Sequence, residues 1–449
     1  MHNLAIALHK KGAHVTGSDD YIFEPSKSQL ERYNLLPQNI GWHPEVITED
    51  IDFVVLGMHA RKDNPELLRA QELDLKIYSF PEFVYERVKE KTRVVIAGSH
   101  GKTTVASMVL HILKYMSRDE DYLVGAHLKG YETMVNLTEI GNYAILEGDE
   151  YPSSPIDPRP KFLHYHPNIA LITGIAWDHV NMFPSFETYV EQFELFTKSI
   201  VNGGVLIYNS EDNILKALVE KSSNHIRKIP YSKHPHKIVN DITQIETPIG
   251  FAGLEIFGAH NMSNLSATKW ICQQIGINEE DFYEAILSFK GASKRLECIF
   301  RNEETIVFKD FAHSPSKVKA TVEAVKSQYS GRKLIAFLEL HTYSSLSKEF
   351  IGQYRDCLKN ADETVVFYLP ETLSIKKLEP LSPKEIEMAF NHHNMSVFED
   401  SKYLQNFIAR LDHKNMSLLF MSSGNFGGID LKGIIRNIAT LFISLFISL

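Results

Sequence analysis

Cysteine is scarce in this 449-residue chain, which contains only Cys272, Cys298 and Cys357. These residues are far apart and fit neither a metal site nor a redox pair, so we expect buried, unpaired thiols in a protein of the reducing cytoplasm. An excess of basic residues is also missing. The formal net charge is −9, which argues against nucleic acid as a partner.

The chain also lacks an apolar segment long enough to cross a membrane. The run IATLFISLFISL at 438–449 falls short of the ~20 residues that a spanning helix needs. We expect a terminal helix or a sequence artefact there, and no membrane partner. The opening residues MHNLAIALHKKG predict an amphipathic helix that ends at Gly12, and no signal peptide.

What is present is typical of a globular α/β protein, with 44% hydrophobic and 23% charged residues. Strand-like runs alternate with helical patterns in three blocks, which we interpret as domains covering residues 1–88, 89–292 and 293–449. In the first block the expected strands are 13–20, 51–60 and 75–80. In the third, a helix is expected to begin at Pro315 after the strand TIVFKD.

The most informative stretch is RVVIAGSHGKTTVASMVL at 93–110. A β-branched strand leads into a glycine loop, and apolar residues with helical spacing follow at once. Backbone N–H groups at such a helix start and the Lys102 ammonium would hold polyphosphate, while the Thr103 hydroxyl would reach Mg²⁺. The loop is shorter than the common G-x-x-x-x-G-K-[ST] pattern, because Ile96 stands where its first glycine would be.

Two later strands end in residues that could complete a metal site. Glu147 follows the strand YAIL, and His179 follows an apolar strand and Trp177-Asp178. The carboxyl ends of parallel strands meet at one edge of a sheet, so Thr103, Glu147 and His179 are predicted to converge there. The alternative is that Glu147 caps a helix and His179 serves only its loop.

Three further motifs carry polar side chains that could bind a ligand. His260 and Asn261 in GAHNMSN begin a helix and suit an adenine edge; the alternative is that Asn261 or Ser263 caps the helix. Arg295 in GASKRLE and Asp310 in KDFAHSP could form an ordinary surface ion pair. Asp19 ends the strand predicted at 13–20, where a carboxylate either holds a ribose hydroxyl or caps a helix.

These motifs together resemble the Mur ligase family. GSHGKTT, EGDE, WDH, GAHNMSN, GASKRLE and DFAHSP occur in that family's order, and the short phosphate loop is the family's own. The resemblance implies three domains: a Rossmann-like N-terminal domain, a P-loop ATPase-like central domain and a Rossmann-like C-terminal domain. It implies an ATP-dependent ligase of peptidoglycan synthesis or recycling in the cytoplasm. Such enzymes join UDP-N-acetylmuramate to an amino acid or peptide through an acyl phosphate.

The resemblance also implies residue roles. Lys102, Glu147 and His179 would be catalytic, and Thr103, Glu147 and His179 would bind Mg²⁺. ATP would be bound by Gly98, Ser99, His100, Gly101, Lys102, Thr103, Thr104, His260, Asn261, Asn264, Arg295 and Asp310. Substrates would be bound by Ser18, Asp19, His59, Asn64 and His313.

The amine substrate is predicted from the segment EGDEYPSSPIDPRPKFLHYHP at 147–167. It is longer than the EADESDASFL typical of the alanine-adding members. It is similar to the murein-peptide ligases, which attach the tripeptide L-alanyl-γ-D-glutamyl-meso-diaminopimelate. Three alternatives remain: an L-alanine ligase, a non-catalytic nucleotide-binding homologue, and a folate-type glutamate ligase, against which the separate first domain argues.

The chain departs from the family pattern in two places. The strand and glycine loop that open the family's UDP domain are missing before residue 1, so we expect upstream in-frame DNA to encode them; a stop codon directly before Met1 would refute this. After the strand KLIAFLEL, the chain has His341, Thr342 and Tyr343 where relatives place an arginine for the incoming carboxylate.

Overall fold

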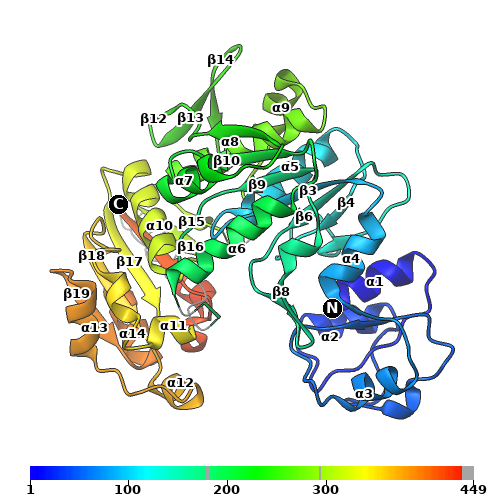
Figure 1. Ribbon diagram of the computed structural model, residues 1–449. Helices are drawn as coiled ribbons and strands as arrows, with labels where there is room; N and C mark the ends of the chain where they lie inside the picture. Colours follow the sequence, from blue (N-terminus) through cyan, green and yellow to red (C-terminus); the bar gives the residue numbers. More distant parts are fainter. Residues whose placement is uncertain (178–181, 184, 293–294, 437–449) are drawn as a thin grey trace. The chain divides into compact units, whose positions relative to one another are not determined.

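The computed structural model describes residues 1–177, 182–183, 185–292 and 295–436. Contacts divide the chain into two compact units. Unit 1 comprises Met1–Ile175, Ser185–Ser232 and Ser263–Ile286, and unit 2 lies mainly in 233–262 and 287–436. Each unit contains a parallel or mixed sheet with helices, as predicted for an α/β protein (Figure 1). The three-domain boundaries remain a prediction.

The N-terminal part of unit 1 begins with a helix, as the sequence predicts. Its elements are α1 (His2–Lys10), α2 (Ser26–Arg32), η1 (Pro44–Val46), β1 (Val54–Leu56), α3 (Pro65–Glu72), β2 (Ile77–Ser79) and α4 (Phe80–Val88). Strands β1 and β2 pair in parallel. The strand predicted at 13–20 is wrong: in the described chain this stretch makes only an isolated bridge between Asp19 and Gly41, so its backbone has no ladder to join.

This N-terminal part packs against the following part of unit 1 through an apolar cluster. Leu4 and Ala7 from α1, together with Tyr78 and Phe83, contact Val135. The Asn3 side chain accepts a hydrogen bond of 3.1 Å from the Met134 amide. Burial of these side chains is the main stabilising term, since each apolar residue removed from water contributes about 1.5–3 kcal/mol.

The larger part of unit 1 is built on a seven-stranded sheet. Its strand order is β11-β10-β9-β3-β6-β4-β5, and every neighbouring pair is parallel except β4 and β5. The strands are β3 (Thr92–Ala97), β4 (Asp121–Leu123), β5 (Val135–Asn136), β6 (Tyr143–Glu147), β9 (Ile169–Ile172), β10 (Val205–Asn209) and β11 (Arg227–Tyr231). Because the central strands are covered on both faces, they are almost entirely apolar.

Helices and a hairpin complete this sheet. They are α5 (Lys102–Tyr115), β7 (Pro152–Ser154), β8 (Asp157–Pro160), η2 (Lys161–His164), α6 (Phe186–Ser199), α7 (Asn213–Lys221), α8 (Ala259–Gln274) and α9 (Glu279–Ile286). Helix α5 follows β3 and packs on β3 and β6. The buried Phe162 of η2 stacks on Phe196 of α6 with ring centroids 4.6 Å apart. This packing fixes the segment that follows the end of β6.

Unit 2 contains a second sheet of six strands in the order β15-β16-β20-β17-β18-β19, in which only β15 is antiparallel. Its strands are β15 (Glu297–Arg301), β16 (Thr305–Asp310), β17 (Lys333–Glu339), β18 (Glu363–Phe367), β19 (Met395–Phe398) and β20 (Met416–Met421). The helices are α10 (Pro315–Gln328), α11 (Tyr343–Leu346), η3 (Ile351–Tyr354), α12 (Pro370–Ile375), α13 (Pro383–Phe390), α14 (Ser401–Ala409) and η4 (Phe426–Gly428). As predicted, α10 begins at Pro315.

A small antiparallel sheet also belongs to unit 2. It consists of β12 (His236–Val239), β13 (Ile242–Thr247) and β14 (Gly250–Leu254). The Thr243 hydroxyl donates to the Gln328 side chain at 2.8 Å, which connects this sheet to α10. Several of its apolar side chains are exposed, among them Phe251 and Ile249.

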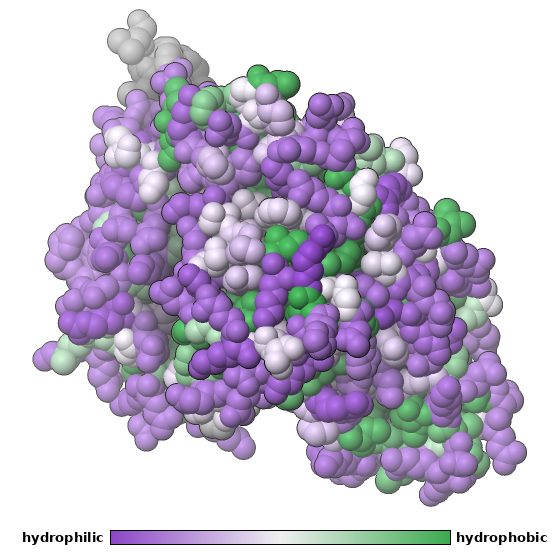
Figure 2. Space-filling model, turned by 45° about the horizontal axis from the view of Figure 1, so that its top comes forward, coloured by the Kyte–Doolittle hydropathy of each residue, from purple (hydrophilic) through white to green (hydrophobic). Residues whose placement is uncertain are grey.

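The face shown in Figure 2 is predominantly hydrophilic, with hydrophobic residues in small groups. Among the described residues, none of the helices has both the length and the apolarity required to span a bilayer. The expectation of buried, unpaired thiols is confirmed for Cys272 and Cys357, whereas Cys298 is free but exposed, on the edge strand β15.

We expect Phe337→Ala to destabilise unit 2 strongly. Phe337 is fully buried and stacks on Phe420 with ring centroids 4.4 Å apart. Its truncation should lower the free energy of unfolding by about 3–5 kcal/mol. Phe251→Ala is the matched control, since Phe251 is 54% exposed and should change stability little. Equal shifts of the two variants in thermal or urea unfolding would contradict this account of the core.

Candidate active site

The phosphate loop lies between β3 and α5, as predicted. Gly98 has φ +120° and Gly101 has φ +80°, both in the region that favours glycine. A Cβ atom on Gly98 would collide with the Thr173 side chain, and one on Gly101 would collide with Asn264. The loop therefore needs glycine at both positions, and the Asn264 side chain of α8 packs directly on it.

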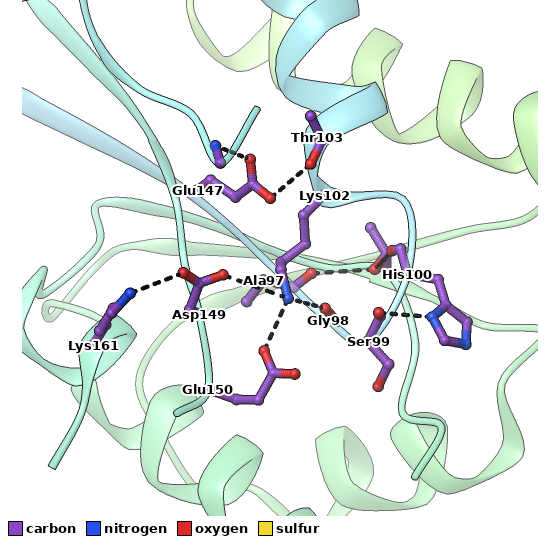
Figure 3. A network of polar contacts seen from close by, with 12 residues as sticks. Ala97, Gly98, Ser99, His100, Lys102, Thr103, Glu147, Asp149, Glu150 and Lys161 are labelled. Atoms are coloured by element: carbon purple, nitrogen blue, oxygen red, sulfur yellow. Dashed lines mark hydrogen bonds and ion pairs between the residues drawn. The ribbon is translucent and has the colours of Figure 1, made fainter. Parts of the chain in front are cut away.

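Lys102 is the first residue of α5, and its ammonium group lies among acidic side chains (Figure 3). Its Nζ atom donates to the Gly98 carbonyl and to Glu150 Oε2, each at 2.9 Å, and lies 3.9 Å from Asp149 Oδ1. Burial by itself would lower the pKa of Lys102, but the charges of Glu150, Asp149 and Glu147 outweigh burial and raise it. The lysine is thus held fully charged beside the loop.

Thr103 and Glu147 meet at the same edge of the sheet. Thr103 Oγ1 donates to Glu147 Oε1 at 2.8 Å, and the Gly125 amide donates to Glu147 Oε2 at 2.7 Å. Burial and the charge of Asp149 raise the pKa of Glu147, whereas Lys102 and the two hydrogen bonds oppose this. A hydroxyl and a carboxylate are oxygen donors of the kind that Mg²⁺ prefers, so these two residues fit the predicted ion.

The third predicted metal ligand, His179, lies outside the described residues. Within the part of the chain that the structure describes, no group of three His, Cys, Asp or Glu side chains is arranged to hold a metal ion. The role of His179 as the third metal ligand, beside Thr103 and Glu147, therefore remains a prediction.

A buried hydrogen-bond chain supports Glu150. The Tyr189 hydroxyl of α6 donates to Glu150 Oε1 at 3.0 Å and lies 2.8 Å from Ser99 Oγ in the phosphate loop. Glu150 and Tyr189 are almost completely buried. Because a buried carboxylate needs partners, Glu150 is fixed between the lysine and the tyrosine, and it positions Lys102 in turn.

The remaining loop residues have structural contacts of their own. Thr104 is buried on α5, and His100 Nδ1 lies 2.7 Å from the Ser99 carbonyl. The Thr173 hydroxyl donates to the His100 carbonyl. The loop is therefore fixed partly from within and partly by Thr173, and its helix start remains the predicted ligand-binding end.

Unit 2 carries His260 and Asn261, two more of the predicted nucleotide residues. Asn261 Nδ2 donates to the Phe257 carbonyl at 2.9 Å, while burial lowers the pKa of His260 to about 4 and keeps its ring neutral. Among the described residues, His260 Nδ1 has no hydrogen-bond partner. Asn264 belongs to unit 1, although it lies on the same helix as His260 and Asn261.

Asp310 ends β16 and is held by backbone amides. Leu296 N and Ala312 N donate to its two oxygens at 2.7 and 2.5 Å. The Arg295 guanidinium lies 5.0 Å from the Phe311 ring centroid, and His313 Nδ1 lies 2.8 Å from the Phe311 carbonyl. The surface ion pair considered for Arg295 and Asp310 is thus wrong for Asp310, which is buried.

Comparisons with known proteins identify the family. The Mur ligase middle domain matches residues 96–271, and the Mur ligase glutamate ligase domain matches residues 294–424. Together the two models cover more than half of the chain. The chain belongs to the Mur ligase family. Mur ligases are ATP-dependent ligases that form amide bonds, and their three-domain α/β fold is the one predicted.

Relatives of this Mur ligase agree in fold and differ in amine. A UDP-N-acetylmuramate–L-alanine ligase of Caldicellulosiruptor bescii is 29% identical, over 82% of this chain and 80% of its own. Among solved structures, the alanine ligase of Thermotoga maritima has a TM-score of 0.69 at 20% identity, and a murein peptide ligase of Psychrobacter arcticus has 0.64 at 21%. Each comparison covers 98% of this chain and 96% of the other.

The predicted substrate residues of the N-terminal part have mixed surroundings. The Asn64 side-chain oxygen caps α3 by accepting from the Glu66 and Leu67 amides, each at 3.0 Å. Asp19 and His59 are exposed, and Ser18 is half-buried. The helix-capping function is therefore established for Asn64, and the substrate roles of the four residues remain predictions.

Sequence reasoning missed Asp149, Glu150 and Tyr189 as parts of this Mur ligase site. For the two acids a signal existed, because they stand two and three residues after Glu147 at the same strand end. Tyr189 had no signal, since an aromatic residue on an amphipathic helix is normally part of the core. Only the packing of α6 brings its hydroxyl to Glu150.

We expect Gly98→Ala to weaken ATP binding by about 100-fold, equivalent to about 2.7 kcal/mol. The added methyl group must displace Thr173 or distort a backbone with φ +120°. Isothermal titration calorimetry with a non-hydrolysable ATP analogue would measure this. Gly331→Ala is the control, since its Cβ would meet nothing within 4 Å. Unchanged affinity of Gly98→Ala would contradict the proposed role of the loop.

We expect the Asp310 carboxyl to titrate near pH 6. Burial raises its pKa from 3.8 to about 6, although the Ala312 amide and Arg295 oppose this. Since the folded pKa exceeds the unfolded one, its contribution to stability is present below about pH 4 and is lost as the pH rises to about 6. Carbon-13 NMR of labelled aspartate should show this midpoint, and Asp310→Asn should abolish it. A midpoint near 4 would refute the shift.

Proposed function

We propose that this Mur ligase joins the carboxylate of UDP-N-acetylmuramate to an amine, with ATP as the energy source. The observation that carries the proposal is the Lys102 ammonium group. It is held at a glycine-loop helix start beside Thr103 and Glu147. This arrangement suits the transfer of a phosphoryl group, in which positioning and charge stabilisation do most of the catalysis.

The chemistry follows from the poor reactivity of a carboxylate towards an amine. Transfer of the γ-phosphoryl group to the carboxylate gives an acyl phosphate, which has a good leaving group. The amine then attacks the acyl carbon, an amide forms, and phosphate leaves. Lys102 would hold the transferring phosphoryl group, and the amides of the loop would hold the neighbouring phosphates. A Mg²⁺ ion held by Thr103, Glu147 and His179 would supply charge neutralisation of the phosphates.

Two amines are candidates, and different observations favour them. The Caldicellulosiruptor bescii relative described above favours L-alanine, because it is an L-alanine ligase. The segment 152–164 favours the tripeptide, because its sequence is similar to that of the murein-peptide ligases; it forms the β7–β8 hairpin and η2 directly after the acidic strand end. We put L-alanine first on sequence similarity and keep the tripeptide as the second candidate.

The end of β17 in unit 2 bears on the choice of amine, because relatives place an arginine for the incoming carboxylate just after this strand. Glu339, at the end of β17, is buried; Ser422 Oγ donates to it, as does the Phe426 amide, at 2.8 Å. Thr342 caps α11 by accepting from the Ser345 amide at 3.1 Å. Thr342 is thus part of a helix start, and no arginine stands at 341–343 to receive a carboxylate.

We expect ADP release to require ATP, Mg²⁺, UDP-N-acetylmuramate and one amine. Lys102→Met should lower the rate by at least about 1,000-fold, because the charge that stabilises the transferring phosphoryl group is lost. A coupled ADP assay with L-alanine and the tripeptide as separate amines, supported by mass spectrometry of the product, would assign the substrate. Binding of ATP and UDP-N-acetylmuramate without turnover with either amine would instead support a non-catalytic homologue.

A further inference from the structure

Lys161 lies beside the phosphate loop although it is remote from it in the sequence. It is the first residue of η2, whose backbone is fastened to the acidic strand end. Lys161 N donates to the Tyr151 carbonyl at 3.1 Å, and Phe162 N donates to the Asp149 carbonyl at 3.1 Å. With Phe162 packed in the core, the backbone under Lys161 is fixed before any ligand binds.

The Lys161 side chain reaches towards Lys102 from the opposite side of Asp149 (Figure 3). Its Nζ atom is 3.3 Å from Asp149 Oδ2, and the other oxygen of that carboxylate is 3.9 Å from Lys102 Nζ. It also lies 4.2 Å from the Tyr151 ring centroid. A single carboxylate thus stands between two ammonium groups, which marks a place where an anion is stabilised from two sides.

The Lys161 ammonium group has N–H donors available for a ligand. An ammonium group has three N–H donors. Within the described residues, the Lys161 side chain makes one hydrogen bond, to Asp149. The side chain is 17% exposed, so an anion can reach it. Its positive charge also lowers the pKa of the Met1 amino group, behind the larger effect of burial, which places Lys161 near the start of α1.

An excess of acidic side chains around Lys102 favours a second cation at this site. The acidic side chains Glu147, Asp149 and Glu150 outnumber Lys102 and Lys161. Phosphoryl transfer brings two further anions together, the γ-phosphate and the acceptor carboxylate, which repel each other. Lys102, which is bonded to the Gly98 carbonyl, would be engaged with the phosphate under the proposed function. The acceptor carboxylate therefore needs a partner of its own.

We propose that Lys161 is a substrate-binding residue whose ammonium group binds the acceptor carboxylate of the acid substrate. This inference rests on the proposed function, because that function supplies the acid. Lys161 would hold the carboxylate beside the phosphoryl group that Lys102 holds, with Asp149 keeping the two ammonium groups apart. The rival role is purely structural, an ion pair that fixes Asp149.

The test compares Lys161→Met and Lys161→Arg with the wild type in the full-length chain. Lys161→Met should weaken UDP-N-acetylmuramate binding by about tenfold or more, and Lys161→Arg should restore most of it. Affinity for a non-hydrolysable ATP analogue should stay within about twofold, because Lys102 is untouched. Lys216→Met, which removes an exposed charge on α7, is the matched control and should change neither affinity.

A second ligand distinguishes the carboxylate from the diphosphate of the same substrate. UDP-N-acetylglucosamine carries the diphosphate but no carboxylate, so its weaker binding should not change in Lys161→Met. Equal loss for both sugars would overturn the proposal, as would equal loss of ATP affinity or no loss at all. If the wild type itself fails to bind UDP-N-acetylmuramate, the proposed function fails as well, whereas an unaffected variant of a binding wild type refutes only the role of Lys161.

Discussion

The site depends on one buried charge arrangement, the Lys102 ammonium group among three carboxylates. A lysine that is removed from water keeps its proton only where opposite charges compensate for the lost solvation. Glu150, Asp149 and Glu147 provide this compensation, and they all come from the end of one strand. The carboxylates in turn need the lysine, so neither side of the arrangement is stable without the other.

This arrangement also explains why the glycine loop and the hairpin occur where they do. The loop places Lys102 at a helix start, and glycine at 98 and 101 lets Thr173 and Asn264 approach the backbone. After the β7–β8 hairpin, η2 brings the chain back to the end of β6, at Glu147. A short stretch of sequence thus supplies both the acids and the proposed second cation, and the core residue Phe162 holds that return in place.

Much of the site was readable because its signals are local. The strand, loop and helix at 93–110 have distinct patterns, and Glu147 ends a recognisable buried strand. Other parts had no local signal. From the sequence, Tyr189 is expected to be a core aromatic residue and Cys298 a buried thiol. Cys298 is instead exposed, because β15 lies at the edge of its sheet. The strand predicted at 13–20 failed because strand propensity does not supply a bonding neighbour.

The sequence by itself determined the phosphate loop and the helix after it, the helix start at Pro315, and membership of the Mur ligase family, because each depends on residue types at short, fixed spacing. The tertiary structure decided which acids surround Lys102, that Tyr189 supports Glu150, and that Lys161 faces the same carboxylate. These contacts join residues 12 to 48 positions apart. The distances between these residues depend on how the strands and helices pack, and no local sequence pattern encodes that packing.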